Sequence, residues 1–189
     1  MRAIETEHDG HVFRSRIEAR WSVFFNEAGL QYEYEKQGFH LNGRRYLPDF
    51  WLPKPCWWIE IKGTRPGGRE RRLARRLMRE SGCNTYIFYG SPATVEQGGF
   101  PVWTFPALGE EQQNERGQYV LQHLARILVA IELGFWIEPA DADQAQEARL
   151  LEWDWMGRFH HSLDAGRKAR FEHEQVGAPR QWAQATLTR

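Results

Sequence analysis

The chain has 189 residues, a formal net charge of zero and a hydrophobic content of 41%. This composition excludes a disordered chain and suits one globular domain with an extension. The longest uninterrupted apolar stretch, ILVAI, is too short to span a bilayer, and the N-terminus lacks the apolar region of a signal peptide. We therefore predict a cytoplasmic protein that does not enter a membrane, with Cys56 and Cys83 as reduced thiols.

Although the net charge is zero, basic and acidic residues are distributed unevenly along the chain. Residues 1–82 contain 16 Lys and Arg against 11 Asp and Glu, whereas residues 83–189 contain the remaining 9 and 14. The N-terminal half is therefore the half that we expect to face a polyanion.

The first predicted element is a helix within residues 14–30. Its apolar side chains recur at helical spacing, and Gly29 suits a C-terminal stop. The apolar stripe consists of Ile17, Trp21, Phe24, Phe25 and Ala28.

An Asn-Gly pair at 42–43 predicts a hairpin with a two-residue turn. Such a turn would place Phe39 opposite Tyr46 and would bring Lys36 near Asp49. We expect the second strand to continue over residues 46–52, to break at the sequence PKPC, and to be followed by a strand at 57–62. Together these segments predict a three-stranded antiparallel meander after the first helix.

The remaining periodicity completes an α/β pattern. A second helix is expected at 69–82, strands at 84–90 and 101–105, and further helices at about 117–134 and 144–161, followed by a loosely held polar tail. The element order of the core is then α-β-β-β-α-β. We divide the chain into a core over 1–110 and a C-terminal helical extension over 111–189. Trp153, Trp155 and Phe159 are expected to pack within the helices of that extension.

Ionised side chains interrupt the otherwise apolar stretch YLPDFWLPKPCWWIEIKG. Glu60 and Lys62 point to one face of their strand, and a loop over 53–56 would place Asp49 directly across from Glu60. Two carboxylates that close repel each other unless a cation lies between them, and oxygen ligands suit Mg²⁺ or Mn²⁺. The alternative is a buried Asp–Lys–Glu ion network that only holds the hairpin together.

These residues also form a pattern known from a protein family. Pro48-Asp49, ten intervening residues and then Glu60-Ile61-Lys62, on adjacent strands after a helix that carries Glu18, resemble the PD-(D/E)XK nuclease superfamily. That superfamily includes restriction endonucleases, Holliday-junction resolvases and TnsA-like nucleases. The chain looks most like small phage-type endonucleases of this group, and the resemblance covers about residues 12–90.

The resemblance implies a restriction-endonuclease-like αβββαβ core with a mixed sheet. It implies that Asp49 and Glu60 are metal ligands together with the backbone carbonyl of Ile61. Lys62 would position the attacking water, and Glu18 would serve a second metal or its water shell. The implied cofactor is Mg²⁺, for which Mn²⁺ substitutes, and the implied products carry a 5′-phosphate and a 3′-hydroxyl.

Glu18 has a second interpretation. Ser15 and Glu18 also match S-x-x-E, a capping box in which the side chain of Glu18 would accept a hydrogen bond from the backbone N–H of Ser15. We favour the catalytic role, because Ser15 can cap the helix alone.

Basic residues cluster on and around the second predicted helix. Such clusters suit contacts with nucleic-acid phosphates, although a solvated helix face is the alternative. The candidate nucleic-acid-binding residues are Arg14, Arg16, Arg20, Arg65, Arg69, Arg72, Arg76 and Arg79. Lys36, Arg44 and Arg45 on the hairpin can be ordinary surface charge.

We therefore predict a Mg²⁺-dependent DNA nuclease, endonucleolytic rather than exonucleolytic. One alternative is a catalytically silent nuclease fold that binds nucleic acid or acts as an architectural subunit of a recombination or transposition assembly. Another is an interaction protein whose acidic C-terminal helices dock a partner. DNA is the predicted partner, and the oligomeric state stays open, with a homodimer among the alternatives.

Overall fold

The computed structural model describes residues 4–107, 112–114, 117–133 and 142–171. In chain order, the helices and strands are β1 (Thr6–His8), β2 (His11–Phe13), α1 (Arg16–Glu27), β3 (Glu33–Tyr34), β4 (Phe39–Leu41), β5 (Arg44–Tyr46), β6 (Phe50–Leu52), β7 (Trp57–Lys62), α2 (Gly68–Ser81), β8 (Asn84–Tyr89), a 3₁₀ turn (Val95–Gln97), β9 (Val102–Phe105), β10 (Gln112–Asn114), α3 (Gln118–Leu133) and α4 (Ala142–Lys168). Among these ranges, no helix combines the length and the apolar character that crossing a membrane requires.

The centre of the molecule is a mixed β-sheet. Within the described residues it has six strands in the order β10-β9-β8-β7-β6-β3. The strands β7 and β8 run parallel and are joined by α2, whereas the other neighbouring pairs are antiparallel. This confirms the predicted α/β class with a mixed sheet.

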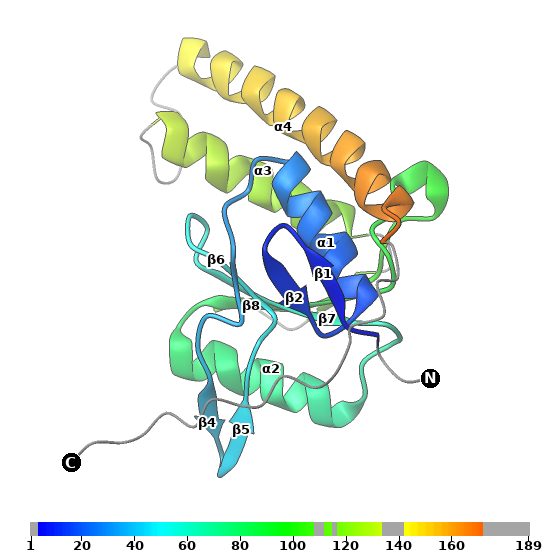
Figure 1. The fold of residues 1–189 in the computed structure, drawn as a ribbon. Helices are drawn as coiled ribbons and strands as arrows, with labels where there is room; N and C mark the ends of the chain where they lie inside the picture. Colours follow the sequence, from blue (N-terminus) through cyan, green and yellow to red (C-terminus); the bar gives the residue numbers. More distant parts are fainter. Residues whose placement is uncertain (1–3, 108–111, 115–116, 134–141, 172–189) are drawn as a thin grey trace, which may run out of the picture.

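The two faces of the sheet are covered by different helices. Figure 1 shows α1, α3 and α4 on one face and α2 on the other. Side chains of β7 alternate between the two layers because successive residues of a strand point to opposite faces. Trp57, Ile59 and Ile61 join the main hydrophobic core with α1, α3 and α4, while Trp58 packs with Leu77 of α2.

The helix α1 forms where the apolar period predicts it. Trp21, Phe24, Phe25 and Ala28 are buried in the main core, and Ile17 packs against it. Ser15 caps the N-terminus, where its side chain accepts a hydrogen bond from a backbone N–H of the first turn. The chain turns at Gly29, which has a positive φ of 69°, so the predicted stop is confirmed.

The last helix is longer than predicted. The expected helix at 144–161 and the start of the expected loose tail form one helix, α4, which continues to Lys168. It continues because Leu163 is buried and because Gly166 lies so close to α1 that an added Cβ would stand 2.6 Å from the carbonyl oxygen of Arg20. Beyond the helix, Phe171 packs against the main core, so this part of the predicted tail is not loose either, and residues 172–189 lie outside the described residues.

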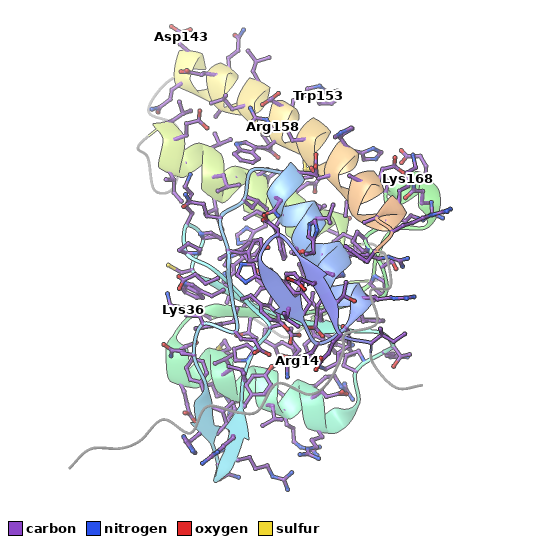
Figure 2. All side chains as sticks on the ribbon, viewed as in Figure 1. Arg14, Lys36, Asp143, Trp153, Arg158 and Lys168 are labelled. Carbon is purple, nitrogen blue, oxygen red and sulfur yellow. The ribbon has the colours of Figure 1, made fainter. Side chains whose placement is uncertain are left out.

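Packing of the aromatic side chains on α4 is only partly as predicted. Phe159 is fully buried and Trp155 packs against the core. Trp153 is instead 82% exposed, and Figure 2 shows it pointing outward from α4. The residue is on the outer side of α4, which has no further layer to cover it within the described chain.

The Asn-Gly turn forms the predicted hairpin, β4–β5, with Phe39 opposite Tyr46. Both turn residues have positive φ, 53° for Asn42 and 73° for Gly43, as a type I′ turn requires. The strand predicted at 46–52 is nevertheless interrupted at 47–49, so that β5 belongs to the hairpin and β6 to the main sheet.

The predicted proximity of Lys36 to Asp49 is wrong. In the main sheet Tyr34 pairs with Phe50, which shifts the register by one residue relative to the hairpin. This register brings Glu35 rather than Lys36 level with Asp49, and the backbone N–H of Glu35 donates a hydrogen bond of 2.9 Å to the carbonyl oxygen of Asp49. Lys36 instead forms an ion pair of 2.8 Å with Glu33 and lies 5.2 Å from the ring centroid of Trp51.

Candidate active site at strands β6 and β7

The pairing of β6 with β7 brings the two predicted metal ligands together. Trp51 lies opposite Trp58 and Leu52 opposite Trp57, so residues 53–56 form the predicted loop. Continuing this register by two residues beyond Trp51 places Asp49 opposite Glu60. The side chain of Asp49 confirms the placement, because its Oδ2 accepts a hydrogen bond of 2.6 Å from the backbone N–H of Ile61.

Asp49 is almost completely buried, with 2% of its surface exposed. Its Oδ1 accepts a hydrogen bond of 2.6 Å from Nη2 of Arg14, and Nε of the same arginine lies 2.6 Å from Glu35. In Figure 2 the half-exposed Arg14 lies on the side of α1 that faces α2. Arg14 was predicted to contact nucleic acid, but the structure places its guanidinium on a candidate catalytic carboxylate.

Glu60 is buried and is held by two donors from the same face of the sheet. The hydroxyl of Tyr46 donates to Oε2 at 2.9 Å. The ammonium of Lys62 donates to Oε1, as expected from their positions two residues apart on β7. The two neighbours fix the orientation of this carboxylate.

Glu18 lies at the start of α1 and is also buried. Its Oε1 accepts from the hydroxyl of Ser15 at 2.6 Å, and its Oε2 accepts from the hydroxyl of Tyr34 at 2.7 Å and from the backbone N–H of Arg14 at 3.1 Å. The glutamate thus binds groups at the start of the helix, but through the hydroxyl of Ser15 and the N–H of Arg14 rather than through the Ser15 N–H that a capping box uses. Its charge also acts on Asp49, so the capping role and a role at the carboxylates are compatible.

The surroundings of Asp49 disfavour its ionised form. Burial raises the pKa of Asp49 well above its usual range, and the negative charges of Glu60 and Glu18 raise it further. Lys62 and the N–H of Ile61 oppose this shift. We call Glu18, Asp49, Glu60 and Lys62 the carboxylate site, because their charges act on one another. An additional cation would relieve the crowding of negative charge there.

The basic and phenolic partners keep their protons. Burial acts to lower the pKa of Lys62, but the charges of Glu60 and Asp49 outweigh it and raise that pKa, so the side chain remains an ammonium. Burial and the neighbouring Glu60 raise the pKa of Tyr46 well above its usual range. Burial and the hydrogen bond to Glu18 likewise raise the pKa of Tyr34. Both tyrosines therefore act as donors to carboxylates at neutral pH.

The donor set fits a hard divalent cation. Mg²⁺ is commonly held by one or two carboxylates and keeps several waters and substrate oxygens as further ligands. Asp49 and Glu60 supply two carboxylates from adjacent strands, and each carboxylate oxygen retains lone-pair capacity beyond its present hydrogen bond. Within the described residues, no group of three or more His, Cys, Asp or Glu side chains is arranged to hold a metal ion by itself.

The predicted basic residues separate into two sets. Arg69, Arg72, Arg76 and Arg79 are all exposed on α2, and none of them forms an ion pair within the described part of the chain. We call these four residues the arginine surface. The opposite stripe of the helix, Leu73, Ala74, Leu77 and Met78, packs inward as predicted.

The other predicted basic residues lie elsewhere. Arg20 donates a hydrogen bond of 3.1 Å to Ser91 and is only partly exposed. Arg16 is partly buried at the start of α1, and Arg65 is exposed in the loop between β7 and α2. Of the eight predicted basic residues, only Arg69, Arg72, Arg76 and Arg79 thus share one helix, α2.

The sequence did not predict that Tyr34 and Tyr46 donate hydrogen bonds to the acids, or that Arg14 pairs with Asp49. The one available signal was that Tyr46 stands beside the acidic stretch and opposite Phe39 in the predicted hairpin. Tyr34 carries no such signal, because it meets Glu18 through a side-chain contact between residues 16 apart in the sequence. The short hairpin β1–β2 before α1 was also not predicted.

Comparison with protein-family models, with curated proteins and with solved structures finds no match to this chain.

Proposed function

We propose that this protein is a metal-dependent DNA nuclease, acting as an endonuclease that hydrolyses phosphodiester bonds. The observation that carries the proposal is the pairing of two buried carboxylates, Asp49 and Glu60, with a protonated lysine on the same face of the sheet. The exposed arginine surface on the helix that follows β7 supports a polyanionic substrate. Cleavage would leave a 5′-phosphate and a 3′-hydroxyl.

Asp49, Glu60 and the backbone carbonyl of Ile61 would hold the ion, with Mg²⁺ as the cofactor and Mn²⁺ as a substitute. A bound ion of this kind supplies Lewis-acid activation of a phosphodiester and a template for in-line attack. Lys62 places a positive charge beside the carboxylates, where it can orient a water and offset negative charge that develops on the phosphate. Tyr46 and Tyr34 hold the carboxylates of Glu60 and Glu18 in position.

The element order supports the assignment of a restriction-endonuclease-like core. The hairpin β4–β5 is inserted between β3 and β6 and pairs outside the main sheet. Apart from it, α1, β3, β6, β7, α2 and β8 give the order helix, three strands, helix and strand, with β7 and β8 parallel. In this assignment residues 1–110 form the PD-(D/E)XK core and residues 111–189 form the helical extension. DNA is the proposed substrate and no membrane is involved.

One observation favours a second candidate, a catalytically silent protein that binds nucleic acid or serves as an architectural subunit. Asp49 already has a cationic partner in Arg14, and Glu60 has one in Lys62. Such an ion network can hold the sheet together without a metal. This candidate predicts salt-sensitive DNA binding with no metal-dependent cleavage.

The experiment is a cleavage assay with supercoiled plasmid, linear duplex and branched DNA, each in Mg²⁺, Mn²⁺ or EDTA. We expect cleavage that requires metal, and loss of about 10³-fold or more in rate for Asp49→Asn and for Glu60→Gln, because several kcal/mol of transition-state stabilisation disappear. Asp154→Asn is the matched control, since Asp154 is an exposed carboxylate on α4. Wild-type cleavage by either site variant would overturn the proposed site, and metal-independent binding without any cleavage would support the silent candidate.

A further inference from the structure

The hairpin β4–β5 is a separate projection of the molecule. Its two strands pair only with each other, and Figure 1 shows the hairpin crossing α2 and ending beyond it. It is docked through one face, on which Leu41 is fully buried in a cluster with Leu77 and Trp58. Phe39 adds an edge-on contact with Trp58, with ring centroids 5.2 Å apart. The hairpin is therefore held at a defined position against α2.

The free end of the hairpin is basic. Arg44 and Arg45 are exposed, as is His40, which lies opposite Arg45. Neither arginine forms an ion pair or a hydrogen bond within the described part of the chain, and each thus presents an uncompensated charge to solvent. Because the hairpin packs on α2, these charges extend the arginine surface beyond the helix.

The base of the hairpin reaches the carboxylate site. Tyr46, the last residue of β5, donates its hydrogen bond to Glu60. Arg44 is two residues away along the strand, which at about 3.3 Å per residue corresponds to roughly 7 Å. One DNA strand advances about 3.4 Å per base step, so the basic tip stands on the order of two base steps along the hairpin from the residue that contacts the carboxylate site.

We propose that the hairpin β4–β5 binds double-stranded DNA and makes duplex the substrate of the nuclease; this inference rests on the proposed function. A two-stranded ribbon has dimensions that the major groove of B-DNA admits. Binding of single strands generally uses aromatic platforms on which bases stack. On this hairpin the large aromatic side chains Phe39 and Tyr46 pack inward against Trp58 and neighbouring residues. The exposed side chains are His40, Asn42, Arg44 and Arg45.

The exposed aromatic side chains that could stack on bases lie elsewhere. Tyr119 and Trp153 are 73% and 82% exposed, but they belong to α3 and α4 on the opposite face of the sheet. The face that carries the carboxylates, the arginine surface and the hairpin therefore offers charge rather than stacking. This combination favours the phosphate backbone and groove of a duplex.

The test is the salt dependence of binding in EDTA, measured by fluorescence anisotropy with a labelled duplex and with one of its single strands. The Arg44→Gln, Arg45→Gln double variant should reduce the slope of log affinity against log salt by up to about 1.8 for the duplex, since each lost contact contributes about 0.9. The slope for the single strand should stay unchanged. Replacing both arginines with lysine should restore the duplex slope, because lysine keeps the charge.

The control is an Arg149→Gln, Arg167→Gln double variant, which removes the same charge from exposed positions of α4. It should leave both slopes unchanged. An unchanged duplex slope in the hairpin variant, or an equal fall for duplex and single strand, would overturn the proposal, as would a lysine variant that binds no better than the glutamine variant. EDTA keeps the DNA intact, so these outcomes are independent of whether the wild-type protein cleaves.

Discussion

The sheet residues of the carboxylate site, Asp49, Glu60 and Lys62, face α2, the helix that carries the arginine surface. The charges of the two regions are compensated in different ways. In the carboxylate site the acids are buried, and Asp49 and Glu60 each have a basic neighbour within the chain, Arg14 and Lys62. On the arginine surface the four guanidinium groups are exposed and have no acidic partner within the described residues. A buried charge needs an internal partner, whereas an exposed one is stabilised by water and can meet an external anion.

This difference predicts a separation of roles. The carboxylate site is fixed in geometry, as chemistry on a phosphodiester requires, and the arginine surface is free to contact any phosphate that approaches. Changes in the first region should alter the rate of cleavage, and changes in the second should alter affinity. The following predictions test the separation, starting with the largest expected effect.

Changing Arg69, Arg72, Arg76 and Arg79 to Gln should weaken binding to all DNA sequences alike. If all four contact phosphates, the slope of log affinity against log salt falls by up to about 3.6, which corresponds to roughly three orders of magnitude in affinity at about 0.1 M salt. Cleavage at saturating DNA should change much less, because these contacts stabilise ground and transition states alike. Anisotropy titrations and single-turnover rates measure the two effects. An unchanged slope would mean that this face is only solvated.

Lys62→Gln removes one positive charge from the carboxylate site. We expect the single-turnover rate in Mg²⁺ to fall about 10²- to 10³-fold, as for the loss of one group that stabilises developing negative charge. The matched control is Arg79→Gln, which removes one charge from the arginine surface. In EDTA, Lys62→Gln should reduce the affinity for DNA by no more than Arg79→Gln does. If Lys62→Gln reduced affinity but not the rate, the proposed separation of the two regions would fail.

Glu18→Gln tests the two roles of the residue at the start of α1. Glutamine preserves a capping partner but removes the negative charge, so the melting temperature should stay close to that of the wild type while cleavage falls about 10- to 100-fold. Ser15→Ala is the complementary variant and should cost about 1 kcal/mol of stability through the lost cap. A stable and fully active Glu18→Gln variant would leave Glu18 with the cap alone.

Tyr46→Phe makes the smallest change, because it deletes only the hydroxyl that donates to Glu60. A carboxylate that loses such a partner is less well oriented, and we expect the rate to fall about 10-fold. The Mg²⁺ concentration needed for half-maximal cleavage should rise by a similar factor, which a purely structural role would not produce. Tyr119→Phe, at an exposed position on α3, serves as the control and should change neither quantity.

Much of the local structure could be predicted from the sequence. The apolar stripe of α1, the arginine period of α2 and the Asn-Gly turn each depend on neighbours a few residues apart, and all three are confirmed. The loop over 53–56 also has a local signal, which made the pairing of Trp51 with Trp58 predictable. Since this pairing sets the register, the placement of Asp49 opposite Glu60 followed from the sequence as well.

The contacts around those acids were decided only by the tertiary structure. A one-residue shift between the hairpin and the main sheet brings Glu35 rather than Lys36 level with Asp49, and the cation that pairs with Asp49 is Arg14, 35 residues earlier in the chain. Tyr34 reaches Glu18 from 16 residues further along the chain, and α4 is extended because Gly166 permits close contact with α1. Periodicity and turn chemistry act over a few residues, whereas such contacts depend on how distant elements pack, which no local pattern contains.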